Sequence, residues 1–272
     1  MNRNLSLGQY YPGNSILHRA DPRTKILMSI AFMALAFSSD DAFDFLLLAA
    51  FAAGAIAASS IPPSVVFRSA ASILPLIIFA SVLNIFMTPG RQLFRFWIIA
   101  PTIEGVALAL KMAARVALII FGGSSLLIFT TTPIMLTDGV ESLLKPLKRL
   151  RAPVHELAMM MTIALRFIPL LMEETDKIMR AQASRGADFN EGKLLDRARS
   201  FIPIIIPLFV SAFRRADELA NAMEARCYRG GEGRTRLRQL RMARLDACLL
   251  AAFAAVTAVF VAANTFGFFK FI

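Results

Sequence analysis

Residues 247–269 read ACLLAAFAAVTAVFVAANTFGFF and contain no charged side chain. Three other stretches, 45–67, 69–90 and 116–137, are equally free of charge. Since about 20 apolar residues carry a helix across a bilayer, each of the four is expected to span a membrane. Ile26–Ser39 is short for a span but can cross if Arg23 and Lys25 extend to the headgroups. The sequence therefore predicts an all-α membrane protein with about five transmembrane helices.

Basic residues are concentrated in one part of the chain. The net charge is +11, and residues 133–244 hold 20 of the 30 Lys and Arg residues and 13 of the 19 acidic ones. By the positive-inside rule this segment faces the cytoplasm, together with the basic N-terminus. Anionic lipid headgroups account for the charge, and a nucleic-acid partner is disfavoured because acids interleave with the bases and no binding motif is present. We expect a multi-pass protein of the cell membrane.

The chain is expected to have three parts. Residues 1–132 form an N-terminal lead-in and transmembrane helices, 133–244 form a cytoplasmic-face module, and 245–272 form the last transmembrane helix. In the module, Thr132 followed by Pro133 is typical of a helix start. Apolar residues recur there at spacings of three and four, which predicts three long amphipathic helices. The apolar positions include Leu143, Leu147, Met160, Met161, Phe209 and Phe213.

Two of these helices are expected to end in the same way. In each, an aspartate (Asp176 or Asp217) precedes an arginine by nine positions, and the two copies are 41 residues apart. The ends read Ser184-Arg185-Gly186 and Ala225-Arg226-Cys227. Arginine and glycine also suit an ordinary helix C-terminus, but their repetition favours a pair of binding ends. A guanidinium is a planar fork of donors and a frequent interface hot spot.

The chain resembles the T component (EcfT) of energy-coupling factor (ECF) transporters, the vitamin-uptake branch of the ABC transporters. The resemblance covers nearly all of the chain up to about Leu240. It is carried by the segments Gly8–Ser15, His18–Lys25, Thr137–Pro146, Arg166–Pro169, Glu173–Lys177, Phe213–Glu218 and Arg229–Arg236. Members of this family have two Ala-Arg-Gly signatures, and the two arginine ends stand at those places.

The resemblance implies a coupling role. Each signature would dock in a groove of one of two cytosolic ABC ATPase subunits, the EcfA-like partners. The long helices would form a scissor-like module under a membrane-embedded, exchangeable S component, which binds the vitamin or other micronutrient. Leu143, Leu147, Met160, Met161, Phe209 and Phe213 would contact this S component or the membrane. Cys227 replaces the family's glycine, which costs about 1 kcal/mol if that position needs a positive φ.

Chemistry within the chain itself is not expected. The sequence has no phosphate-binding Gly-x-x-x-x-Gly-Lys-Ser/Thr loop, so ATP would be bound and hydrolysed by partner subunits. Cysteine and histidine lack metal-ligand spacing, and no catalytic nucleophile pairs with a histidine. We therefore expect a non-catalytic subunit without a cofactor or metal.

Two other classes remain as alternatives. A self-contained secondary transporter or channel would need polar residues along a route across the membrane, and here these are sparse: Asn84, Lys111 and Arg115. A membrane-bound transferase would need a clustered acidic metal motif, which is missing from the sequence. Lys111 and Arg115 are expected to extend to the headgroups or pair with Glu104, and Asp44 is expected at the membrane interface.

Overall fold

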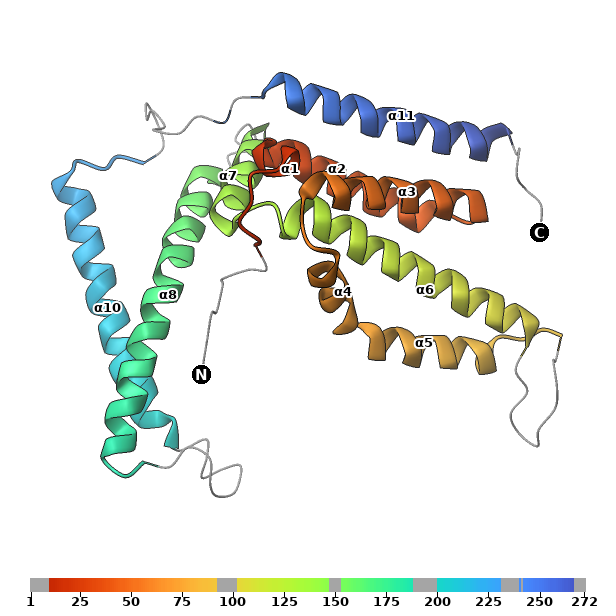
Figure 1. Cartoon of the computed structure of the whole chain (residues 1–272). Coiled ribbons are helices and arrows are strands. Elements are labelled where there is room, and N and C mark those ends of the chain that lie inside the picture. The colour runs from red at the N-terminus through yellow and green to blue at the C-terminus, as the bar shows by residue number, and fades with distance from the viewer. Residues whose placement is uncertain are drawn as a thin grey trace. The chain divides into compact units, whose positions relative to one another are not determined.

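The computed structural model describes residues 10–91, 102–146, 153–187, 200–230, 240 and 242–266 (Figure 1). The chain divides into two compact units, one of residues 1–143 with 238–272 and one of residues 144–237. In the described residues, each unit is built from helices. The all-α class is therefore confirmed, while the three-part division inferred from charge stays a prediction.

The first unit packs helices from both ends of the chain. In Figure 1, α11 lies alongside α2 and α3, and α6 lies on their other side. The bounds are α1 Ile16–Arg19, α2 Pro22–Ser38, α3 Ala42–Ser59, α4 Pro63–Ala71, α5 Leu74–Met87, α6 Ile103–Gly123, the π-helix η1 Ser124–Ile128, α7 Pro133–Leu143 and α11 Arg244–Phe266.

Among the described residues, four helices are long and apolar enough to cross a membrane: α3, α6 with η1, α11, and α8 (Val154–Ser184) of the second unit. The pair α4 and α5 qualifies together, with a bend of 55°, as a possible fifth span. The expected number of about five spans is thus confirmed. The segment that forms α8 was expected only to lie along the membrane; its first half is apolar enough to pass the same test because it carries little charge.

The helix boundaries differ from the charge-free stretches. Within 45–67, α3 already ends at Ser59, where Ser60 has a φ of 54° and Pro62-Pro63 begin α4. Within 69–90, the helix breaks before Pro75, because proline cannot donate to the carbonyl four residues back and clashes with it. The span expected at 116–137 begins earlier, at Ile103. Backbone chemistry, rather than charge, sets these ends.

Aromatic packing joins three helices of the first unit. Phe51 of α3 lies between Phe32 of α2 and Phe253 of α11, with ring centroids 5.8 and 5.3 Å apart. Phe32 is fully buried and packs directly on Gly122 of α6, where any side chain would overlap its ring. The core of this unit therefore depends on one close helix–helix approach that only glycine permits.

A buried polar cluster ties the start of α2 to α11. Lys25 is only 2% exposed and its ammonium donates to Thr130 O at 2.9 Å and to Thr131 Oγ1 at 3.2 Å. The Asp246 carboxylate accepts from the Asp21 N–H at 2.7 Å and the Ala243 N–H at 2.8 Å. The expectation that Lys25 extends to the headgroups is therefore wrong: its ammonium is buried inside the protein and bonds to a carbonyl and a hydroxyl oxygen there.

A further expectation about charges is corrected. Lys111 Nζ and Arg115 Nη2 lie 3.4 and 3.5 Å from Asp40 Oδ1 in the α2–α3 turn, so their acidic partner is Asp40. Glu104 instead accepts from the Arg91 N–H at 2.7 Å, which closes the α5–α6 connection. Asp44 is buried within the protein, where Asn264 of α11 donates to its carboxylate at 3.3 Å, and its place at the membrane interface stays a prediction.

The expected first helix of the cytoplasmic-face module is present but short. α7 begins at Pro133, as predicted, and Thr132 Oγ1 accepts from the Met135 N–H at 3.3 Å. The helix then ends at Leu143 after 11 residues and belongs to the first unit. Within the described part of the chain, long amphipathic helices therefore number two, α8 and α10 (Ile202–Ala225).

Asp246→Ala tests the polar cluster. The substitution leaves the buried Asp21 N–H and the part-buried Ala243 N–H without their acceptor and removes a charge near Lys25, so we expect a loss of about 3 kcal/mol of stability. The measurement is thermal unfolding of the purified chain in detergent. Asp41→Ala is the matched control, since Asp41 also stands at a helix start but makes no cap hydrogen bond, and we expect a change below about 0.5 kcal/mol. Equal midpoints for the two variants would contradict the role of Asp246.

Candidate docking site at two helix ends

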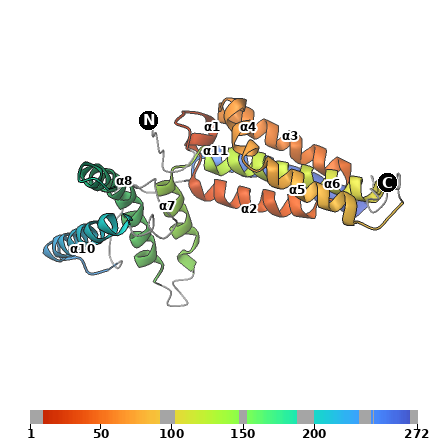
Figure 2. The same cartoon turned by 90° about the horizontal axis from the view of Figure 1, so that it is seen from below.

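α8 and α10 make up the described helical part of the second unit, and Figures 1 and 2 show them crossing. Both contain a proline in the apolar half, Pro169 in α8 and Pro207 in α10, and both continue as helix beyond it. Few side chains of either helix are buried: Val154 and Ala158 in α8, and Ile204 in α10. Long helices with so little buried surface have faces available for partners or lipid.

An ion pair joins the two helices at equivalent positions. Arg215 Nη2 lies 2.8 Å from Glu174 Oε2, and each side chain is about one-third exposed. The two residues are 41 apart, the same offset that relates Arg185 to Arg226. Each therefore precedes its terminal arginine by the same number of residues, which at 1.5 Å per residue is about 16 Å along either helix. We call Glu174 and Arg215 the pivot pair.

The end of α8 is closed by its own backbone. The Gly186 N–H donates to Ala183 O and the Ala187 N–H donates to Gln182 O, both at 3.0 Å. Gly186 has a φ of 86°, which turns the chain back on the last carbonyls. This is a Schellman motif, in which Arg185 is the C-cap and Gly186 the C′ residue.

The end of α10 has the same motif, position for position. The Cys227 N–H donates to Glu224 O at 2.8 Å and the Tyr228 N–H to Met223 O at 3.0 Å. Cys227 has a φ of 55°, so this position does require the left-handed conformation in which a non-glycine residue is strained. Arg226 is the C-cap and has nearly the backbone angles of Arg185: φ and ψ are −91° and 12°, against −89° and 7°.

Both arginine side chains are exposed at these ends. Neither has an ion-pair or hydrogen-bond partner among the residues that the structure describes. Ser184 and Ala225, one position earlier, are exposed as well, and Ser184 Oγ donates to Arg180 O of its own helix. We call Arg185 and Arg226 with their neighbouring residues the arginine tips. Two unpaired guanidinium groups, each at a helix end with nearly the same backbone conformation, can donate hydrogen bonds to two similar surfaces that are rich in acceptors.

The predicted S-component or membrane contacts are only partly described. Met160 and Met161 of α8 are more than half exposed, as are Phe209 and Phe213 of α10, whose rings stack 6.3 Å apart. Leu143 is half-buried at the end of α7 in the other unit, and Leu147 lies outside the described residues. The pivot pair was missed by sequence reasoning, although its 41-residue offset was visible in the repeat.

Taken together, the several apolar spans are those of a multi-pass membrane protein, and the arginine tips give it two matching, exposed helix ends. Comparison with known proteins agrees with this class. Residues 13–237 match the CbiQ family, described as cobalt transport protein. The chain is 55% identical over 246 residues to the energy-coupling factor transporter transmembrane protein EcfT of Ruminiclostridium cellulolyticum. The matched region covers 90% of this chain and 92% of that protein.

Other relatives with the same description are equally complete. The protein of Thermosediminibacter oceani is 53% identical over 253 residues, covering 93% of this chain and 94% of its own length. The protein of Lactococcus lactis is 44% identical over 260 residues, and the matched region covers 95% of this chain and 97% of that protein. The chain therefore belongs to the CbiQ/EcfT family of transmembrane transporter proteins.

The strain at the second tip can be measured directly. Cys227→Gly removes the left-handed penalty of about 1 kcal/mol, so we expect the Tyr228 amide to exchange its hydrogen about fivefold more slowly. Gly186→Ala adds the same penalty at the first tip, where a Cβ meets no neighbouring atom, so only backbone strain changes. The Ala187 amide should then exchange faster. Equal exchange rates in the variants and the unaltered chain would contradict the strain.

Proposed function

We propose that this chain is the coupling subunit of an ECF transporter, a role that follows from its membership of the EcfT family. It would transmit the ATP-driven motion of two cytosolic ABC ATPases to a membrane-embedded S component, which takes up a vitamin or other micronutrient. The observation that carries the proposal is the pair of arginine tips, closed by the same motif and free of partners within the described residues. The chain itself would bind no ATP and catalyse no reaction.

The geometry of the second unit suits two similar ATPases. Two related subunits offer two related grooves, and each would receive one guanidinium at the end of a rigid helix. The pivot pair lies at the same distance from both tips, so α8 and α10 would act as arms of equal length. Closing of the ATPases on ATP would bring the tips together, and the crossing at Glu174 and Arg215 would convert that motion into a change of angle between the arms.

The orientation follows from charge. We place the N-terminus and the arginine tips on the cytoplasmic side, because basic residues are concentrated in both regions. The helix α3, the bent pair α4–α5 and α6 with η1 qualify as spans before Pro133, and we count the shorter α2 as a fourth crossing, which puts the two regions on the same side. Two ATPases in the cytoplasm could then reach both tips.

The apolar faces of α8 and α10 would contact the membrane-embedded partner or the lipid. Met160, Met161, Phe209 and Phe213 are exposed near the apolar halves of α8 and α10. Methionine is flexible and polarizable, and phenylalanine buries a large area, so this surface can accept more than one partner shape. We propose that these four residues contact an exchangeable S component or the lipid beside it.

A self-contained transporter or channel is not favoured. Asn84 Nδ2 donates to Ala80 O of its own helix, and Lys111 and Arg115 are paired with Asp40. These polar groups therefore serve the structure of the first unit, and they do not define a polar route across it.

Removing the forks tests the docking. Arg185→Ala and Arg226→Ala should each weaken binding of the ATPase subunits by about 2 kcal/mol, as expected for a hot-spot arginine, and the double variant should abolish copurification and uptake. Arg185→Lys keeps the charge and loses the fork, so it should also weaken binding. Arg180→Ala is the control, because Arg180 is exposed on the same helix before the tip. Unchanged copurification and uptake in the double variant would reject the proposal.

Exchanging charges tests the pivot pair. Glu174→Arg and Arg215→Glu each place like charges at the crossing, so we expect slower uptake by up to about fivefold, since a partly exposed pair is worth up to about 1 kcal/mol. Each tip can still dock, so the ATPases should copurify as before. The double exchange restores the pair and should recover uptake. A double variant no better than the single ones, or single variants at full activity, would contradict a role in coupling.

A further inference from the structure

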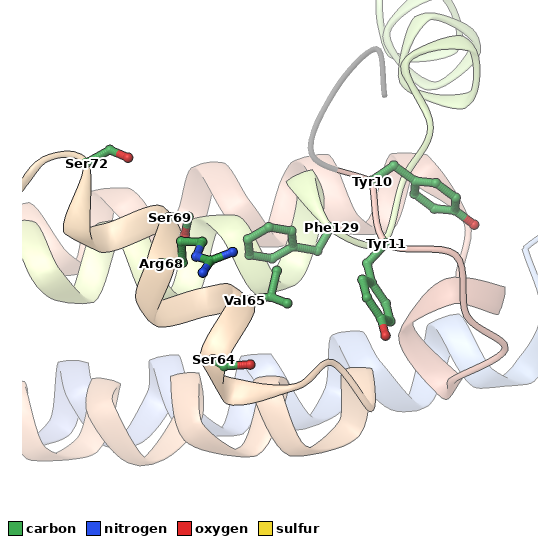
Figure 3. A pocket seen from close by; sticks show the side chains of 8 residues that line it. All are labelled: Tyr10, Tyr11, Ser64, Val65, Arg68, Ser69, Ser72 and Phe129. Atoms are coloured by element: carbon green, nitrogen blue, oxygen red, sulfur yellow. The ribbon is translucent and has the colours of Figure 1, made fainter. Parts of the chain in front are cut away.

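An open pocket of about 560 Å³ lies in the first unit, away from the residues assigned to docking (Figure 3). Arg68 and several serines of the α4 segment form one wall, and Tyr10 and Tyr11 form the opposite wall. Phe129 lies between the two walls. The volume is within the range of ligand sites and far exceeds the room that one small ion needs. None of these residues has a role in the docking described above.

The wall on α4 is polar along a single stripe. Ser64, Arg68 and Ser72 follow one another at intervals of four residues, which places them on one helical face. The opposite face is fixed by apolar contacts: Val66 is 1% exposed, and the ring of Phe67 meets that of Phe121 edge-on at 5.4 Å. These contacts hold α4 so that its polar stripe faces the pocket, as Figure 3 shows.

The tyrosine wall is held in place by hydrogen bonds. The Tyr11 N–H donates to Phe129 O at 3.0 Å, and the Tyr11 carbonyl lies 2.9 Å from His18 Nε2. The other nitrogen of that ring, Nδ1, lies 2.6 Å from Ser15 Oγ. A Cβ on Gly13 would lie 3.0 Å from the same ring, so glycine permits this close fold of the segment. The pocket therefore has two built walls.

The pocket favours an anion. Arg68 is exposed, and within the described residues its guanidinium has no acidic or hydrogen-bonding partner. No aspartate or glutamate is among the lining residues. Ser64, Ser72 and Tyr11 add hydroxyl donors that no described group accepts from. A fork of charged donors beside several hydroxyls suits a phosphate group with its multiple acceptor oxygens.

The depth of the pocket points to a lipid. Two candidate spans end beside it, α3 at Ser59 and η1 at Ile128, and the lining residues on α4 and at Phe129 follow those ends directly. Residues just past the end of a span lie at the level of the headgroups, where tyrosine is also enriched. Val65 and Phe129 give the pocket apolar surface next to its charge, which suits the glycerol and upper acyl chains of a lipid better than free phosphate.

We propose that this pocket binds the headgroup of an anionic phospholipid, with its phosphate on Arg68 and the serine stripe of α4. In the orientation argued from charge, the lipid belongs to the cytoplasmic leaflet, whose anionic lipids attract basic residues. The bound lipid fixes the bent pair α4–α5 against the N-terminal segment. The site is independent of the arginine tips, so its test requires neither ATPases nor transport.

Native mass spectrometry of the purified full-length chain tests the site by counting lipids retained on titration. We expect phosphatidylglycerol to bind more tightly than zwitterionic phosphatidylcholine, and Arg68→Gln to weaken phosphatidylglycerol binding about tenfold, the loss expected for a charge-assisted hydrogen bond. Ser64→Ala with Ser72→Ala should weaken binding less. Arg19→Gln is the matched control, because Arg19 is exposed in the same unit but does not line the pocket.

Three results would overturn the proposal. Arg68→Gln could retain phosphatidylglycerol as well as the unaltered chain while keeping the same helix content by circular dichroism. Arg19→Gln could lower binding by the same factor, which would indicate unspecific attraction by net charge. Millimolar inorganic phosphate could displace the lipid in the unaltered chain, which would identify a free anion as the occupant. The proposal expects no displacement by phosphate and an intact helix content in every variant.

Discussion

Both long helices of the second unit end at the residue before an arginine, which is the C-cap, because the residue after that arginine turns the backbone into the left-handed region. At Gly186 this conformation is free of strain, and at Cys227 it is held by the same two hydrogen bonds despite the side chain. The turn satisfies the last carbonyls internally, so the arginine side chain is not needed as a cap. Each guanidinium is therefore left available for a partner, and the nearly identical backbone angles make the two ends equivalent. The proposed grip on two ATPases depends on this equivalence.

The first unit supports the membrane part of the protein by pairing its buried charges. Lys25 bonds to oxygens that follow η1, Asp246 accepts from the start of α2, and Asp44 receives a donor from α11. Each of these contacts joins segments that are far apart in the sequence. A charge inside an apolar helix bundle is costly unless it is satisfied, so these contacts also specify which helices lie together. The unit is thereby closed at both ends of α11, at Asp246 and at Asn264.

Much of this could be predicted from the sequence, and the failures have physical reasons. The all-α class, the approximate number of spans and the start of α7 at Pro133 follow from local rules of hydropathy and capping. The ends of α3 and α4 do not follow from the absence of charge, because Pro62-Pro63 and Pro75 break helices inside apolar stretches. The packing of distant helices decides that Asp40 is the partner of Lys111 and Arg115, and it also buries Asp44. Spacing along one helix cannot reveal such partners. The arginine tips were visible because a repeated pattern is a sequence property, whereas the pivot pair needed the crossing of α8 and α10 to be seen.

Cys227 offers the most direct test of the central claim, since its exposed thiol lies next to Arg226. The other free cysteine, Cys248, is removed by Cys248→Ala, and labelling of Cys227 by a water-soluble maleimide is followed in membranes with and without the two ATPase subunits. Docking of the tip in an ATPase groove predicts that the bound subunits strongly slow the labelling. An equal labelling rate with both ATPases bound would show that the tip remains open to water, and would contradict the account.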